Sequence, residues 1–280
     1  MLTNTKEMLL DAKKNHYGVA QPNMWDLNSL RAIINSCNKT KSPAIIGIAE
    51  AHFKYITPEE AGALIDYYKE KIKTDFSLHL DHGQSFEAII RAIRSGFTSV
   101  MMDCSSLPFD ENVKRTQEVV KIAHACNVTV EAELGHVGMG EDYAKIDTEL
   151  FDLFTNPAEA KKFVELTNVD SLAIAVGTAH GEYKGTPKLD FNRITEISNT
   201  IHVPLVLHGG SGTGDAALAK CISLGISKVN ICTDLMNAAS KSVSAEISHK
   251  NYGDVSLVEQ GAVEKCLIHY MNLFGSSNRY

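Results

Sequence analysis

The sequence predicts an α/β protein of the (β/α)8 TIM barrel class with an additional C-terminal helix. Eight short apolar segments recur along the chain, and segments with helical patterns separate them. The length of 280 residues also suits one barrel, since this fold takes about 250 residues. We therefore predict a single domain over residues 1–280. An open doubly wound sheet is the alternative, and it differs by a reversal of strand order that a sequence does not reveal.

Each apolar segment is too short for a helix and is mostly apolar on both faces, which is typical of buried parallel strands. The predicted strands are Tyr17–Ala20, Ala44–Ile48, Phe76–Leu80, Ser99–Met102, Val128–Ala132, Ser171–Val176, Pro204–Leu207 and Lys228–Ile231.

Helix signals lie between these strands. Thr57 followed by Pro58 combines a capping hydroxyl with a first-turn proline. An insert at residues 134–156 is rich in Gly, Glu and Asp, and it predicts a mobile loop over the active face. The additional helix is expected at about Val255–Phe274. Further helix starts are expected at Ser85, Pro157 and Asp215, with glycine ends at Gly96 and Gly225.

The composition limits the classes of molecule that the protein is expected to bind. A net charge of −7 argues against nucleic acid as the main partner, but a local site for a phosphorylated ligand is compatible with it. Six scattered cysteines without a CxxC pair indicate reduced thiols. The sequence has no signal-peptide pattern and no apolar run of the roughly 18 residues that span a bilayer. We therefore expect a cytoplasmic protein without a membrane partner.

Polar residues follow the predicted strands at the end where barrels build active sites. The third strand runs into Asp81 and His82, the sixth is followed by His180, and the seventh runs into His208. Three imidazoles on separate strands form an open site of the kind that catalytic Zn2+ uses, with the fourth position left to water or substrate. We therefore predict that these histidines bind a divalent cation.

The other histidines receive no such role. His79 is expected to be a hydrogen-bonded core residue. Surface or helix positions without a function are expected for His16, His52, His124, His202, His249 and His269.

Asp103 and Glu133 end the fourth and fifth strands and allow two interpretations. They orient the ligating rings as hydrogen-bond acceptors, or they supply an alternative or second metal position. Burial without any partner is the least favourable alternative, because an unpaired buried charge is costly.

A phosphate site is predicted at the ends of the seventh and eighth strands, where barrels commonly bind phosphate through backbone N–H groups and helix N-termini. A glycine-rich loop alone is often only a tight turn, but its place at these two strand ends favours phosphate. Lys184, in the loop after the sixth strand, could add a positive charge. The segments concerned are Gly209-Gly210-Ser211-Gly212 and Asn230 to Thr233.

Five segments carry a family resemblance: LHLDHG, VEAELG, AVGTAHGEYKGTPKLDF, VPLVLHGGSG and KVNICTD. They resemble the signature segments of class II ketose-bisphosphate aldolases, the family of fructose- and tagatose-1,6-bisphosphate aldolases. The likeness runs from Tyr17 to Arg279 in the family's order. It implies a zinc-dependent aldehyde-lyase that reversibly cleaves a ketose 1,6-bisphosphate to dihydroxyacetone phosphate and glyceraldehyde 3-phosphate. Such a cleavage leaves negative charge next to a carbonyl, and a metal is favoured over a lysine Schiff base because no lysine follows a strand's inner C-terminal end.

The resemblance also implies individual roles. Zn2+ would be bound by the three histidines, and a monovalent cation is left open as a further cofactor. Asp81 would act as the general acid/base at the C4 hydroxyl, and Glu141 would handle protons at the enediolate carbon. Asp103 and Glu133 would line the alternative metal position, and Asn23 and Asn230 would orient the substrate. The dihydroxyacetone-phosphate end would be surrounded by Gly181, Lys184, Gly209, Ser211 and Thr233. Arg279 resembles a C-terminal arginine of tagatose-type members and would contact a phosphate. The family forms dimers or tetramers, so a homodimer or homotetramer is expected.

Two departures from the family pattern concern the substrate. Ala49 stands where a hydroxyl residue is usual, and Cys232 stands where many fructose-type members carry an acid. The alternatives are therefore an aldolase for another phosphorylated sugar or a deoxy-keto acid phosphate, and a weakened sugar-phosphate-binding paralogue. A metal-dependent hydrolase would also fit three histidines, but the phosphate loops and Asp81 argue against it.

Overall fold

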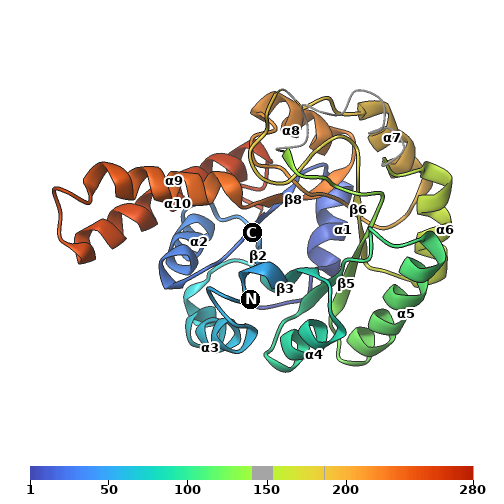
Figure 1. Ribbon diagram of the computed structural model, residues 1–280, viewed down its shortest axis with the longest axis horizontal. Helices are drawn as coiled ribbons and strands as arrows, with labels where there is room; N and C mark the ends of the chain where they lie inside the picture. The colour runs from blue at the N-terminus through green and yellow to red at the C-terminus, as the bar shows by residue number, and fades with distance from the viewer. Residues whose placement is uncertain (141–153, 186, 280) are drawn as a thin grey trace.

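A closed barrel of eight parallel strands in the order β1 to β8 forms the centre of the computed structural model (Figure 1). The structure describes residues 1–140, 154–185 and 187–279. Every strand pairs with its sequence neighbours, and β1 pairs with β8 to close the barrel. The predicted fold class is therefore confirmed, and the doubly wound alternative is wrong. The strands are β1 (Val19–Pro22), β2 (Ala44–Ala49), β3 (Phe76–Gly83), β4 (Ser99–Met102), β5 (Thr129–Leu134), β6 (Ser171–Ile174), β7 (Leu205–Leu207) and β8 (Ile226–Ile231).

Helices cover the outside of the barrel, and one follows each strand. In chain order these eight are α2 (Leu27–Thr40), α3 (Pro58–Tyr68), α4 (Phe86–Arg94), α5 (Phe109–Ala125), α6 (Pro157–Thr167), α7 (Phe191–Thr200), α8 (Asp215–Ser223) and α9 (Thr233–Glu246). Short 3-10 helices, η1 (Glu50–His52) and η2 (Lys69–Lys71), lie on either side of α3.

The helix starts follow the local chemistry of the sequence. Thr57 accepts a hydrogen bond from the Glu60 backbone N–H, and the Glu60 carboxylate accepts one from the Thr57 backbone N–H in return. This capping box satisfies backbone donors that the first helical turn leaves free. Ser85 caps α4 in the same manner by accepting from the backbone N–H of Ala88.

Helix α1 (Lys6–Asn15) closes the N-terminal end of the barrel. The Thr5 hydroxyl lies 2.8 Å from the Thr129 hydroxyl at the start of β5. On the far side, Lys13 Nζ donates to the carbonyl oxygens of the three residues 201–203, just before β7. The open end of the barrel is therefore the opposite one, at the C-terminal ends of the strands.

The predicted C-terminal helix is present as α10 (Tyr252–Leu273). It packs against α9 and α2, and α9 and α10 together project from one side of the barrel (Figure 1). None of the helices in the described ranges combines the length and the hydrophobicity that a membrane span requires.

Candidate active site

Polar side chains from different strands meet at the C-terminal mouth of the barrel. They line a cavity of about 600 Å³ together with residues of the loops that follow the strands. Two buried polar atoms without a hydrogen-bond partner in the described chain, His52 Nδ1 and Asn230 Oδ1, lie here, together with Glu133 Oε2 and His208 Nδ1, which face each other at 2.9 Å. Because unpaired buried polar groups cost free energy, this concentration marks a site prepared for a ligand. The cavity-lining residues supplied by the strand ends are Asn23, Ala49, Asp81, His82, Asp103, Glu133 and Asn230.

The backbone of β3 allows two adjacent side chains to reach this cavity. Successive residues of a strand normally point to opposite faces. His82 has a positive φ of 46°, and the pairing of β3 with β4 shifts register between Leu80 and Gly83. A positive φ is uncommon for a residue other than glycine, and such outliers cluster at functional sites. Asp81 and His82 therefore serve the same site.

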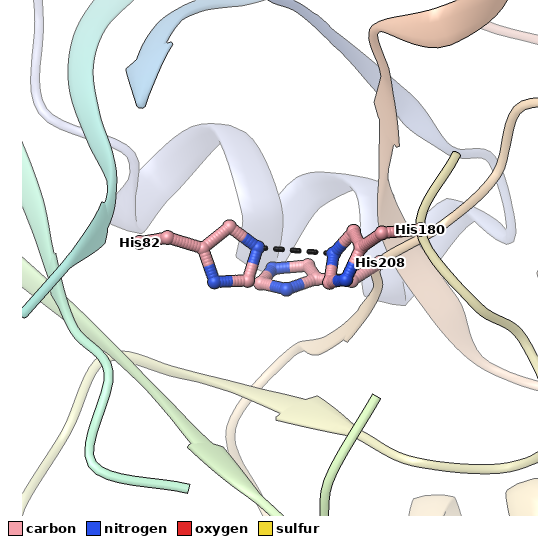
Figure 2. Close-up of side chains that lie close together, drawn as sticks. All are labelled: His82, His180 and His208. Atoms are coloured by element: carbon pink, nitrogen blue, oxygen red, sulfur yellow. Dashed lines mark hydrogen bonds between the residues drawn. The ribbon is translucent and has the colours of Figure 1, made fainter. Parts of the chain in front are cut away.

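The three predicted histidines converge in space, as Figure 2 shows. His82 Nε2 and His180 Nε2 lie 3.1 Å apart, and one nitrogen of each of the three rings lies within 4.8 Å of the others. The ring centroid of His208 lies 4.5 Å from that of His82 and 6.0 Å from that of His180. A divalent cation at their meeting point would accept all three lone pairs.

The outer nitrogens of two of these rings have carboxylate partners. His82 Nδ1 lies 2.7 Å from Asp103 Oδ2, and His208 Nε2 lies 3.0 Å from Glu131 Oε1. A carboxylate behind a ligating imidazole fixes the orientation of the ring and the tautomer. The donor set thus fits a metal ion with borderline character such as Zn2+.

Both interpretations of Asp103 and Glu133 have a geometric counterpart. Asp103 contacts the back of His82, as an orienting acceptor would. Glu133 Oε2 instead lies 2.9 Å from His208 Nδ1, the nitrogen that faces away from Glu131. His82, Asp103 and Glu133 also form a second group whose ligand atoms lie within 4.8 Å of one another, so an alternative cation position remains available.

The electrostatic surroundings differ between the histidines. Burial lowers the pKa of His180 to about 4, with help from the neighbouring histidines. Burial acts in the same direction on His208, but Glu131 and Glu133 outweigh it and raise the pKa of that ring to about 10. His180 is therefore neutral at pH 7, whereas the cation-free site favours a proton on His208.

Asp81 is held by two side-chain amides. Asn23 Nδ2 donates to Oδ2 at 2.9 Å, and Asn230 Nδ2 donates to Oδ1 at 3.0 Å. Burial by itself would raise the pKa of the Asp81 carboxyl, but His82, His208 and Lys228 outweigh burial and hold the pKa well below its usual range. Asp81 is therefore an oriented carboxylate beside the histidines, in place to accept a proton.

The predicted phosphate segments also meet at this end of the barrel. Gly209 and Ser211 line the cavity with Gly181 and Thr233, and Thr233 is the first residue of α9. Gly209 has a φ of +66°, and a Cβ atom there would lie 2.3 Å from the carbonyl oxygen of Ala179. The loop therefore depends on glycine to approach its neighbour. Gly210 packs beneath it, against Val229 and the Asn230 backbone.

Three of the predicted site residues lie elsewhere or outside the described ranges. Glu141 falls outside the described residues. Lys184 is exposed, and its backbone N–H donates to Gly140 O at 3.2 Å. Arg279 stacks on the Tyr17 ring at 4.9 Å, just before β1 and hence at the closed end of the barrel. Arg279 therefore lies away from the cavity residues, and its phosphate contact stays a prediction.

Sequence reasoning missed three residues around the site. Glu131 and Lys228 form an ion pair inside the barrel beneath His208. His52, expected to be a surface or helix position without a function, ends η1 and lines the cavity with its Nδ1 buried. A spacing of two along β5 and β8 would have found the first pair, because it places Glu131 on the face of Glu133 and Lys228 on that of Asn230. His79 conforms to expectation, since it is fully buried with Nδ1 2.8 Å from the Ser99 hydroxyl.

Comparisons with known proteins agree with this geometry. The model of the family "Fructose-bisphosphate aldolase class-II" matches residues 3–279. The YdjI aldolase from Escherichia coli K12 is 33% identical, with a TM-score of 0.90 over 100% of this chain and 99% of that one. A putative fructose-1,6-biphosphate aldolase from Coccidioides immitis is 27% identical, with a TM-score of 0.87 over 99% and 98%. The fructose-bisphosphate aldolase of Campylobacter jejuni, 19% identical over 98% and 95%, shares the fold with a TM-score of 0.85.

The fold, the histidine cluster and these likenesses together define a barrel lyase of the aldolase class. The chain belongs to the class II fructose-bisphosphate aldolase family.

Proposed function

We propose that this aldolase reversibly cleaves a ketose 1,6-bisphosphate, of the fructose or tagatose type, to dihydroxyacetone phosphate and glyceraldehyde 3-phosphate. The observation that carries the proposal is the convergence of His82, His180 and His208 beside the amide-held carboxylate of Asp81. The convergence supports a catalytic cation, and the carboxylate supports proton transfer from the C4 hydroxyl. Zn2+ is the proposed cation.

The three histidines would hold the cation with a position left for substrate, and Asp103 and Glu131 would keep two of the rings oriented. When bound, the cation would supply Lewis-acid polarisation of the substrate's ketone oxygen, which contributes several kcal/mol to a reaction of this kind. Glu133 would add a carboxylate to the same site or line the alternative position.

Asp81 would accept the proton of the C4 hydroxyl as the C3–C4 bond breaks. The C4 carbon then becomes the aldehyde carbon of glyceraldehyde 3-phosphate, and the electron pair of the broken bond remains with C3 and its neighbouring carbonyl. Return of a proton to C3 completes dihydroxyacetone phosphate, a step that we assign to Glu141 from the family resemblance. Asn23 and Asn230 hold the Asp81 carboxylate in one orientation, which favours proton transfer over hydrogen bonding to water.

The phosphate of the dihydroxyacetone end would lie against Gly209, Ser211 and Thr233. Backbone N–H groups and the N-terminus of α9 offer a partial positive charge there. Gly181 would close the same side of the cavity. For the assembly we propose a homodimer or a homotetramer.

A second class of substrate is also proposed, because two cavity residues depart from the family pattern. Ala49 and Cys232 both line the cavity and lack the hydroxyl and the acid usual at their positions. Burial raises the pKa of Cys232 to about 12, so it offers a neutral thiol in place of a carboxylate. These replacements favour a phosphorylated sugar, or a deoxy-keto acid phosphate, with a different hydroxyl arrangement.

The decisive experiment is a coupled cleavage assay with fructose and tagatose 1,6-bisphosphates, on the metal-loaded protein and after thorough chelation. We expect cleavage of at least one bisphosphate that disappears on chelation and returns with Zn2+. Activity that survives complete metal removal would contradict the metal mechanism. Cleavage of neither bisphosphate by the metal-loaded protein would favour the second substrate class.

A further inference from the structure

A buried ion pair lies directly beneath His208 in the interior of the barrel. Lys228 Nζ donates to Glu131 Oε1 at 2.8 Å and to Oε2 at 2.7 Å. The side chains of all three residues are at most 2% exposed. A buried ion pair is weak evidence for stability, because the loss of solvation offsets much of the attraction. Its place behind a candidate metal ligand points to a different role.

The pair fixes which nitrogen of His208 carries a proton. Lys228 donates to both oxygens of Glu131, so Glu131 presents only acceptors. His208 Nε2, 3.0 Å from Glu131 Oε1, must therefore be the donor in that hydrogen bond. In a neutral imidazole the other nitrogen then carries the lone pair. Nδ1 of His208, which lies 2.9 Å from Glu133 Oε2, carries a proton only in the imidazolium form and is thus the nitrogen left for a cation.

We propose that Glu131 and Lys228 form a positioning pair that fixes the tautomer and orientation of His208 and thereby sets the affinity of the site for its divalent cation. The proposal rests on the metal centre of the proposed function. Neither residue is among those that line the cavity in the described chain, so both act through His208 and not on the substrate.

The substitution Glu131→Gln shows why both members of the pair are needed, because it leaves a glutamine side chain in place of the carboxylate. Its amide has one oxygen, and the Lys228 ammonium requires an acceptor. The amide NH2 then faces His208 Nε2, which must become the acceptor, and the ring proton moves to Nδ1 where it blocks the cation. If Lys228 is replaced by methionine as well, the amide is free to turn its oxygen toward His208, and the original tautomer returns.

The test is a zinc-binding titration by competition with a chromophoric chelator, with unfolding temperature recorded for every variant. We expect Glu131→Gln to weaken Zn2+ binding about 10–100-fold, the range for loss of an orienting partner of a metal ligand. The double variant Glu131→Gln/Lys228→Met should recover most of that loss. The double variant Glu131→Met/Lys228→Met, which offers His208 no acceptor, should stay weak although apolar replacement of a buried pair often preserves folding.

Lys13→Met is the matched control, because it also removes a lysine whose ammonium group donates hydrogen bonds within the protein. Lys13 Nζ donates to three backbone carbonyls at the closed end of the barrel, so its loss should lower the unfolding temperature and leave zinc affinity unchanged. Equal zinc affinity in the two double variants would overturn the positioning role, even if Glu131→Gln did not fold. Absence of histidine-dependent zinc binding in the wild-type chain would instead refute the proposed function.

His52 carries a second inference, from an observation independent of the ion pair. It ends η1, directly after β2, and lines the cavity with Ala49 and Ala51. Its Nδ1 is buried without a hydrogen-bond partner among the described residues. Burial lowers the pKa of the ring, so it is a neutral hydrogen-bonding group beside two alanines. A buried polar atom that is left unsatisfied costs free energy unless a ligand satisfies it.

We infer that His52 binds a hydroxyl of the aldehyde half of the substrate. The inference rests on the proposed function, which places the first phosphate against the ends of β7 and β8 and the C4 hydroxyl at Asp81 on β3. The atoms beyond C4 then extend toward the neighbouring strand β2, where His52 lies. A neutral imidazole suits a hydroxyl better than a phosphate, because it lacks the positive charge that favours an anion.

The test compares aldehydes in the condensation direction, with dihydroxyacetone phosphate as the partner. We expect His52→Ala to lower kcat/KM for glyceraldehyde about 5–15-fold, as for one lost hydrogen bond, and to leave propanal unchanged. His52→Asn should restore part of the loss, because its amide reaches the position of Nδ1. His124→Ala, on the outer helix α5, is the control that should change neither aldehyde. An equal loss for both aldehydes would overturn the role of His52, whereas a wild-type chain that condenses neither would refute the proposed function.

Discussion

Replacement of Asp81 by alanine separates proton transfer from metal binding. Asp81 accepts one hydrogen bond each from Asn23 and Asn230, and its carboxylate lies 3.9 Å from His82 Nε2. The orientation of His82 depends on Asp103 at 2.7 Å and not on Asp81. We therefore expect Asp81→Ala to keep the cation and lower kcat by about 10²–10⁴, the usual contribution of a placed acid or base. This corresponds to about 2.7–5.5 kcal/mol in the activation free energy.

The cost of Asp81→Ala in folding stability should be no more than comparable with the lower end of its cost in catalysis. The variant loses two hydrogen bonds to a charged group, each worth about 1.5–3 kcal/mol. It also removes a buried charge, whose desolvation works against folding, and the two freed amides face a cavity that water enters. A net destabilisation below about 3 kcal/mol is expected. Denaturant unfolding of both proteins measures this difference directly.

Asp81→Asn serves as the shape-matched variant. It keeps the volume of the side chain but presents an N–H group to one of the two asparagine amides, and it has no basic oxygen for a proton. Coupled cleavage assays and metal content by atomic emission should show both variants slow and fully loaded. A variant that retains more than a tenth of wild-type kcat, or that loses its metal, would refute the role assigned to Asp81.

Three further outcomes follow from the site. Chelation should lower the unfolding temperature as well as activity, because a cation at 100 times its Kd stabilises by about 2.7 kcal/mol; an unchanged unfolding temperature would contradict a bound cation. His208, with its pKa raised to about 10, holds a proton that the cation must displace. Zinc affinity should therefore rise about tenfold per pH unit between about pH 7 and 9. Calorimetry in two buffers should detect the released proton. A pH-independent Kd would rule this out. Gly209→Ala, which places a Cβ 2.3 Å from Ala179 O, should raise KM for dihydroxyacetone phosphate more than KM for the aldehyde in the condensation direction, and equal changes would argue against the phosphate site.

The strands were predictable because each is a short apolar run buried on both sides, as a barrel inside a ring of helices requires. The errors lie at the ends. The segment expected from Phe76 to Leu80 continues to Gly83, because Asp81 still pairs with Ala49 of β2 and Gly83 pairs with Met102 of β4. At β1 the strand begins at Val19 rather than Tyr17, which faces Arg279 at the closed end. Apolar composition locates a buried strand well. It does not reveal where the strand continues into polar residues that still pair with a neighbouring strand.

The convergence of the three histidines was predictable for a related reason. In a parallel barrel, all strands end at the same mouth, so polar residues just after separate strands must meet. Arg279 obeys no such rule, since the position of a C-terminal tail depends on tertiary packing. The role of His52 was also hidden, because a histidine after a strand end is equally compatible with a solvated turn.

The charges at the mouth explain why the buried residues beneath it are needed. Asp81, Asp103, Glu131 and Glu133 are four carboxylates around the histidines, and Lys228 is the one ammonium that pairs with them in the described part of the barrel. Three negative charges remain, and a divalent cation reduces them to one. Without the cation, the excess favours a proton on His208, in line with its raised pKa. Lys228 therefore balances the charge of Glu131, which must accept a hydrogen bond from His208 whether the cation is bound or not. The charges of the remaining acids are left for the cation to balance.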